Sequence, residues 1–162
     1  MPNLIFYPLI VGESVGKDFV GAHPVCDEQL LLVALLRGSF EYQGLKCSAA
    51  SRAYVPKSVW SRMGGPLCDE VRKITMGDAR DFTNFMTAVI DQRAFDKITG
   101  YIARAQASAS CDVVVGGGSD DSVGWFIEPT IIVTSDPNYE SMIEEIFGPV
   151  LTVFVYEDDD FE

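Results

Sequence analysis

The sequence has little positive charge and almost no histidine. Its 12 Lys and Arg face 24 Asp and Glu, which gives a net charge of −12 over 162 residues. A protein that binds nucleic acid needs a basic surface to displace phosphate counterions, so this balance argues against nucleic acid as a partner. It also argues against binding to an anionic membrane surface. The single histidine, His23, is expected to make a structural hydrogen bond.

Closely spaced cysteine pairs are also absent. The four cysteines are about twenty or more residues apart, whereas zinc sites pair cysteines roughly two to four residues apart. The sequence therefore predicts no metal site. We interpret the cysteines as reduced thiols, which are typical of a reducing compartment such as the bacterial cytoplasm or the mitochondrial matrix. They are Cys26, Cys47, Cys68 and Cys111.

Long apolar runs are lacking as well. The run from Leu4 to Val11 is too short to span a membrane and has no basic region before it, so it is not predicted to be a signal peptide. It is expected to be a strand buried on both faces. Such a strand needs neighbours, and none precede it, so the start of the chain looks unfinished. We find no internal repeat and no low-complexity linker.

Segments with strand and helix character alternate along the chain. This alternation predicts an α/β fold with a mostly parallel sheet flanked by helices. Asp27 is a plausible N-cap for a helix that is apolar over most of its circumference and is therefore expected to be buried. Gly64-Gly65-Pro66 predicts a kink or a break into two short helices. Helices are expected at 27–42, 56–74, 91–107 and 139–144, and strands at 52–55, 112–115, 130–133 and 150–156.

The segment around Cys47 connects the first helix to the next strand. Lys46 precedes the thiol, and small residues follow it. A thiol in such a place can act as a nucleophile, because the thiolate is the reactive form and a nearby cation favours it. The local sequence favours a half-buried structural cysteine, since free cysteines are usually packing residues.

Three segments resemble, in order and approximate spacing, the signatures of the aldehyde dehydrogenase family. The resemblance covers nearly the whole chain. Its closest subgroup is the Δ1-pyrroline-5-carboxylate (L-glutamate γ-semialdehyde) dehydrogenases, through residues 16–24, 39–42, 47–52 and 88–91. The three signature segments are Glu13-Ser14-Val15-Gly16-Lys17, Gly44-Leu45-Lys46-Cys47 and Glu144-Glu145-Ile146-Phe147-Gly148-Pro149-Val150.

The resemblance assigns chemistry to five residues. It implies that Cys47 attacks an aldehyde substrate to form a thioester and that Glu13 activates the hydrolytic water. It also implies that Glu145 binds the nicotinamide-side ribose of NAD and that Phe147 lies beside the nicotinamide. Ser48 would contact the substrate carboxylate. The alternatives are a solvated acid at Glu13, a helix-end acid at Glu145, a core side chain at Phe147 and a turn residue at Ser48.

The resemblance also implies that the chain is the central part of a longer enzyme. Residues 1–12 would be the last strand of an otherwise absent dinucleotide-binding domain, and residues 13–162 an incomplete catalytic domain. The isolated chain is then expected to be inactive, and the full-length protein to be a homo-oligomer. The competing hypothesis is a degenerate homologue that only binds partners. Val15 and Leu45, which replace the family's usual glycine and glutamine, and the helix-breaking Gly64-Gly65-Pro66 favour it.

Overall fold

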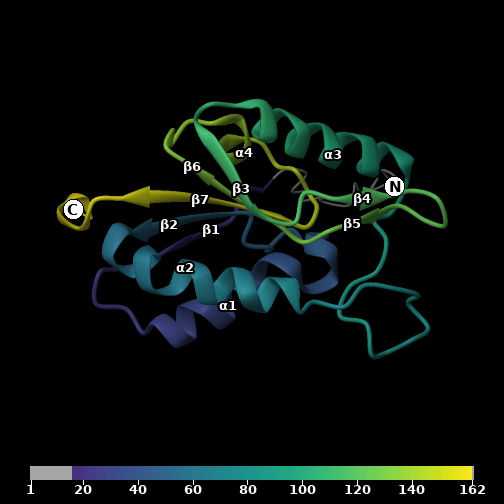
Figure 1. Ribbon diagram of the computed structural model, residues 1–162, viewed down its shortest axis with the longest axis horizontal. Helices are drawn as coiled ribbons and strands as arrows, with labels where there is room; N and C mark the ends of the chain where they lie inside the picture. The colour runs from purple at the N-terminus through teal and green to yellow at the C-terminus, as the bar shows by residue number, and fades with distance from the viewer. Residues whose placement is uncertain (1–15, 162) are drawn as a thin grey trace, which may run out of the picture.

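The computed structural model describes residues 16–161, so the expected strand at 4–11 and the candidate base Glu13 lie outside the described residues. Within this part, five strands form a sheet in the order β1-β2-β7-β6-β3 (Figure 1). The first four are parallel and β3 is antiparallel to β6, which confirms the predicted mostly parallel sheet. The strands are β1 Phe19–Gly21, β2 Arg52–Pro56, β3 Cys111–Val115, β6 Thr130–Thr134 and β7 Val150–Tyr156, and the hairpin strands are β4 Ser119–Asp120 and β5 Phe126–Ile127.

Helices cover both faces of the sheet. Figure 1 shows α1 and α2 on one face and α3 and α4 on the other. This arrangement suits parallel strands, which are usually buried on both faces. The helices are α1 Glu28–Phe40, α2 Lys57–Arg72, α3 Gln92–Ala107 and α4 Glu140–Ile143, with 3₁₀ turns η1 Glu41–Gly44 and η2 Asp158–Asp160.

Aspartate side chains fix the starts of two of these helices. The Asp27 carboxylate accepts from the backbone N–H of Leu30 at 3.0 Å, and Asp91 accepts from that of Ala94 at 2.7 Å. Each bond satisfies a donor that the first helical turn leaves unpaired, which is worth about 1 kcal/mol. The predicted cap at Asp27 is confirmed.

Helix α2 is continuous, so the predicted break into two short helices is wrong. Pro66 lies inside it and removes one intrahelical hydrogen bond, a defect that costs about 3 kcal/mol. Val59, Met63 and Leu67 on the same helix are buried, and burying each such side chain contributes about 1.5–3 kcal/mol. The packed face therefore outweighs the proline.

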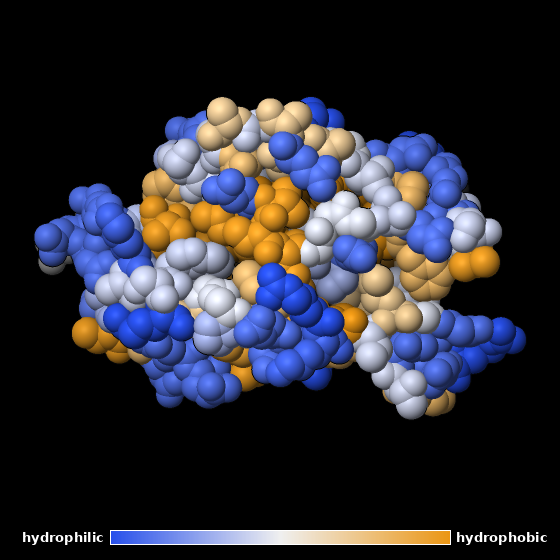
Figure 2. Space-filling model, viewed as in Figure 1, coloured by the Kyte–Doolittle hydropathy of each residue, from blue (hydrophilic) through white to orange (hydrophobic). Residues whose placement is uncertain are grey.

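The expectation that the first helix is buried all round is also wrong. Leu31 and Leu35 of α1 are buried, whereas Leu30 and Val33 are exposed. A helix in an outer layer can turn only one side toward the sheet, so its remaining apolar residues face outward. Figure 2 shows that other apolar residues gather in the middle of the molecule, with hydrophilic residues along the lower edge and at both ends.

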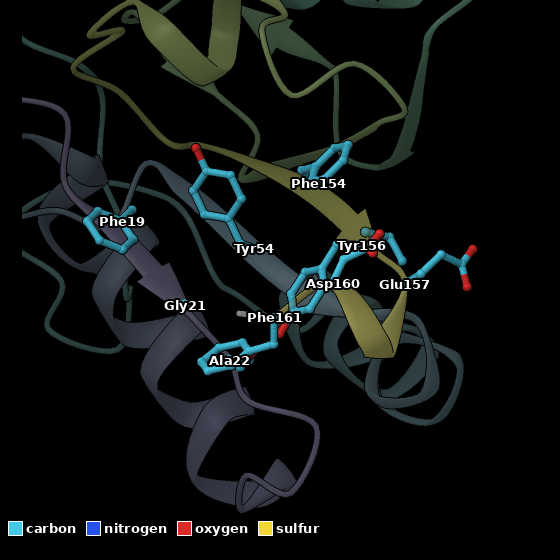
Figure 3. Close-up of a pocket in the computed structure, with 10 residues that line it drawn as sticks. Phe19, Gly21, Ala22, Tyr54, Phe154, Tyr156, Glu157, Asp160 and Phe161 are labelled. Atoms are coloured by element: carbon cyan, nitrogen blue, oxygen red, sulfur yellow. The ribbon is translucent and has the colours of Figure 1, made fainter.

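The open half of one sheet face forms a hollow of about 460 Å³ at the carboxyl ends of β1, β2 and β7. Figure 3 shows aromatic side chains around it, among them Phe19, Tyr54 and Phe161. The Tyr156 hydroxyl donates to the Ala22 carbonyl at its floor. Among the residues described, no helix is both long and apolar enough to cross a membrane.

Candidate active site

Three segments of the candidate site precede three adjacent parallel strands. Gly16 and Lys17 come before β1, the Cys47 loop comes before β2, and residues 144–149 come before β7. Because β1, β2 and β7 are neighbours and parallel, their amino ends meet at one edge of the sheet. The topology therefore gathers segments that lie about 30 and 100 residues apart along the chain.

A small hollow at this amino edge brings together three of the five predicted site residues. Cys47, Glu145 and Phe147 line it together with Gly16 and Gly44. Its volume is about 10 Å³, which is room for roughly one water molecule. Ser48 lies next to Cys47 in the chain and is exposed, but it does not line the hollow.

The backbone that leads into the cysteine loop is left-handed at three consecutive residues. The φ angles of Tyr42, Gln43 and Gly44 are 56°, 57° and 67°. A non-glycine residue pays roughly 1–2 kcal/mol for this conformation. Gln43 is buried, and its Oε1 accepts from the backbone N–H of Thr87 at 3.2 Å, which helps to hold the turn. Leu45 has an ordinary φ of −87°, so the departure from the family's glutamine at this position introduces no backbone strain.

Gly44 places the cysteine loop directly against the segment before β7. A Cβ at this position would lie 2.8 Å from the carbonyl carbon of Gly148 and 3.0 Å from the Ser39 oxygen. Only glycine permits both this approach and the positive φ. Gly44 therefore acts as the contact point between two of the three segments.

Cys47 lies in an exposed turn. The Ala49 N–H donates to the Lys46 carbonyl at 3.0 Å, which closes the turn with the thiol at its tip. No carbonyl in residues 16–161 accepts from the Cys47 backbone N–H. The Lys46 ammonium pairs with Glu41 at 3.0 Å, so the cation that the sequence placed beside the thiol shares its charge with a carboxylate.

The other thiols have different surroundings. All four cysteines are in the described residues, and all are free. Cys68 and Cys111 are buried, Cys26 is half-buried, and Cys47 alone is exposed. Burial raises the pKa of the Cys68 thiol, which lowers its thiolate fraction. Its burial and its raised pKa therefore both slow reaction at Cys68.

Glu145 and Phe147 belong to a segment held by α3. The Lys97 ammonium donates to the Glu145 carbonyl at 2.7 Å, so the half-buried carboxylate of Glu145 remains available. Phe147 has a φ of 61°, and its side chain is 38% exposed. A large apolar residue held in a strained conformation at a surface is typical of a binding site.

Two cations beneath the site were given no role by sequence reasoning. The Lys17 ammonium is buried and has no hydrogen-bond acceptor in residues 16–161. Burial and the charge of Arg52 lower its pKa to about 8. Arg52 donates to the carbonyl of Met142 at 2.9 Å and to that of Lys17 at 3.2 Å, and so connects β2 to α4 and to the segment before β1. A lysine within the first signature segment was the available signal.

Comparison with known proteins gives the family of the chain. The aldehyde dehydrogenase family model matches residues 9–161. The chain is 53% identical over 156 residues to the mitochondrial Δ1-pyrroline-5-carboxylate dehydrogenase of Dictyostelium discoideum, covering 96% of this chain and 28% of that protein. It is 45% identical over 157 residues to the human mitochondrial protein of the same name, with the same two coverages. The chain thus spans little more than a quarter of these relatives.

Solved structures share the fold of this chain, with sequence identities of 33% to 49% in the two examples that follow. A Mycobacterium tuberculosis Δ-pyrroline-5-carboxylate dehydrogenase bound with NAD and cobalamin superposes with a TM-score of 0.86 at 49% identity, covering 92% of this chain and 27% of that chain. A Staphylococcus aureus betaine aldehyde dehydrogenase in complex with NAD⁺ gives a TM-score of 0.82 at 33% identity, covering 88% of this chain and 29% of that chain.

Proposed function

The chain belongs to the aldehyde dehydrogenase family, and from this premise we propose that it is the catalytic segment of an NAD-dependent enzyme that oxidises L-glutamate γ-semialdehyde to L-glutamate. The observation that carries the proposal is the meeting of the exposed Cys47 thiol with Glu145 and Phe147 at one sheet edge. The names of the relatives support the choice of substrate.

In the first step the Cys47 thiolate attacks the aldehyde carbon. A C–S bond forms, the carbonyl π electrons move to oxygen, and that oxyanion needs a hydrogen-bond donor. The Cys47 backbone N–H, which has no carbonyl acceptor in residues 16–161, would donate to it. Ser48, exposed at the same turn, would contact the substrate carboxylate.

Oxidation leaves an acyl group on the Cys47 sulfur, and water then releases it. Glu13 would take a proton from this water, which attacks the thioester carbon as the C–S bond breaks. The products are the carboxylate and the Cys47 thiolate. A carboxylate can serve as this base when its surroundings raise its pKa toward neutrality.

The residues at the amino edge fit an NAD cofactor. NAD would accept the hydride lost from the substrate carbon. Glu145 has a half-buried carboxylate beside the thiol, suited to accept hydrogen bonds from ribose hydroxyls. The exposed Phe147 ring would pack beside the nicotinamide.

In this proposal residues 1–12 are the last strand of a dinucleotide-binding domain. Residues 13–162 are part of a larger catalytic domain. The full-length protein would be a homo-oligomer in the bacterial cytoplasm or the mitochondrial matrix, and the isolated 162-residue chain would be inactive. The competing idea of a degenerate partner-binding homologue loses two of its supports. Leu45 has a negative φ of −87°, and Gly64-Gly65-Pro66 lies within an intact helix.

Steady-state kinetics test the proposal. The full-length protein should reduce NAD⁺ in the presence of L-glutamate γ-semialdehyde, and Cys47→Ser should lower kcat by roughly 1,000-fold or more. Cys68→Ser is the matched control and should retain most of the activity. Full activity in Cys47→Ser would refute the assignment of the nucleophile. NAD⁺ reduction by the isolated 162-residue chain would refute its predicted inactivity.

A further inference from the structure

The Lys17 side chain places an unpaired positive charge next to the candidate site. Its Nζ is buried and has no hydrogen-bond acceptor among the described residues. An unpaired ammonium in a low-dielectric environment costs several kcal/mol unless an anion compensates it. Titratable groups with a perturbed pKa cluster at functional sites. A nearby carboxylate is therefore the expected partner of this ammonium.

Two carboxylates act on this ammonium. The charges of Glu145 and Glu144 raise the pKa of Lys17, against the lowering effects of burial, Arg52 and Lys97. Glu144 is exposed, so water already solvates its charge. Glu145 is half-buried and lines the hollow with Gly16, the residue next to Lys17. Glu145 is therefore the better partner.

The neighbouring cations are already engaged. The Arg52 guanidinium donates to the carbonyls of Met142 and Lys17, and the Lys97 ammonium donates to the carbonyl of Glu145. These bonds hold the backbone of Lys17 and of Glu145. The Arg52 Nε is also buried without an acceptor, but the rest of that guanidinium is bonded to carbonyls, whereas the Lys17 ammonium makes no hydrogen bond within residues 16–161 and can meet the Glu145 carboxylate.

We propose that Lys17 is a positioning residue whose ammonium binds the Glu145 carboxylate and holds it in place for the ribose hydroxyls of NAD. The inference rests on the function proposed above. The ammonium has no acceptor among the described residues, so the pair forms when NAD binds. A carboxylate that accepts from an ammonium on one side keeps its other lone pairs directed at the ribose hydroxyls.

The pair makes NAD binding depend on pH in a defined direction. Before NAD binds, the pKa of Lys17 is about 8. Pairing with Glu145 in the complex would raise it. Affinity should therefore be constant below pH about 8 and fall as the pH rises above it, because binding then requires proton uptake. The other charged groups that act on Lys17 are Arg52, Lys97 and Glu144.

The test measures NAD⁺ affinity of the full-length protein from pH 7 to 9.5 by calorimetry. Lys17→Met should weaken binding by about tenfold and abolish the fall above pH 8. Lys17→Arg should restore most of the affinity and remain flat, because a guanidinium does not titrate in this range. Lys97→Met is the matched control, since Lys97 donates to the Glu145 carbonyl and not to its carboxylate. It should keep a fall in affinity with rising pH, with the onset moved to higher pH because the charge of Lys97 lowers the pKa of Lys17.

A double-mutant cycle guards against a folding defect. Adding Lys17→Met to Glu145→Gln should weaken NAD⁺ binding little further than Glu145→Gln alone, because the partner is already gone. Fully additive losses, or a Lys17→Met protein with wild-type affinity and pH profile, would overturn the inference while leaving the proposed function intact. A wild-type protein that binds no NAD⁺ would overturn the proposed function and the inference with it.

Discussion

The two edges of the parallel strands β1, β2 and β7 differ in volume and in chemistry. The carboxyl edge has a hollow of about 460 Å³ lined by aromatic rings (Figure 3). The amino edge has a hollow of about 10 Å³, yet it holds the exposed thiol, the Glu145 carboxylate and a buried ammonium close by. In open α/β sheets, ligands usually bind at the carboxyl ends of the strands, and this chain places its reactive groups at the opposite end.

The backbone follows the same division. Tyr42, Gln43 and Phe147, the non-glycine residues with positive φ among residues 16–161, all lie at the amino edge. Strained residues persist where the surrounding structure holds them for a purpose. The comparison teaches that in this molecule backbone strain and buried charge coincide with the proposed catalytic site, whereas the larger of the two hollows does not.

The largest expected difference is in thiol reactivity. In the folded chain Cys47 should react with iodoacetamide at least about tenfold faster than the buried Cys68 and Cys111, because access limits those thiols. Site-resolved mass spectrometry of partial reaction gives the rates. Phe161→Ala at the carboxyl edge is the control and should leave the Cys47 rate unchanged. Equal rates at all four cysteines in the folded protein would break the comparison.

A glycine-to-alanine substitution should change the free energy of unfolding in opposite directions at the amino edge and on the exposed surface of α2. Gly44→Ala should lower the free energy of unfolding by about 2–4 kcal/mol, since its Cβ would meet the Gly148 backbone and its φ is 67°. Gly65→Ala in α2 meets nothing within 4 Å and should stabilise by about 0.5–1 kcal/mol. Urea denaturation measures both. A Gly44→Ala protein as stable as the wild type would show that the two segments are not in close contact.

Relief of strain at Tyr42 should give a small effect, opposite in sign to that of Gly44→Ala. Tyr42 is 62% exposed with a φ of 56°, so Tyr42→Gly loses little packing and removes the left-handed penalty. We expect a gain of about 0.5–1 kcal/mol in the free energy of unfolding. Tyr101→Gly within α3 is a contrasting variant and should destabilise. A loss of stability in Tyr42→Gly would mean that the turn is not strained.

Much of the fold could be predicted from the sequence because local patterns agreed with the packing. The predicted strand 150–156 is β7 as observed, and the helix predicted at 91–107 is α3, Gln92–Ala107. The continuity of α2 across Pro66 could not be predicted, because tertiary burial decided it. The exposure of Leu30 on α1 could not either, because hydropathy does not tell which layers surround a helix.

The sequence predicted which residues belong to the candidate site but not how they are arranged. The resemblance named Cys47, Glu145 and Phe147, which the fold brings together, while Glu13 lies outside the described residues. The left-handed Tyr42 and Gln43 had no sequence signal, since such side chains rarely adopt positive φ. The burial of the Lys17 ammonium without an acceptor in residues 16–161 is a feature that only the three-dimensional structure reveals.

The most direct test of the amino edge as the catalytic site is to trap the acyl group. Full-length Glu13→Gln protein would be mixed with NAD⁺ and L-glutamate γ-semialdehyde, quenched in acid and analysed by peptide mass spectrometry. Because hydrolysis is slowed, the account predicts a glutamyl thioester on the peptide that contains Cys47. NADH formation with the acyl group on another residue, or with no acyl-enzyme at all, would contradict it.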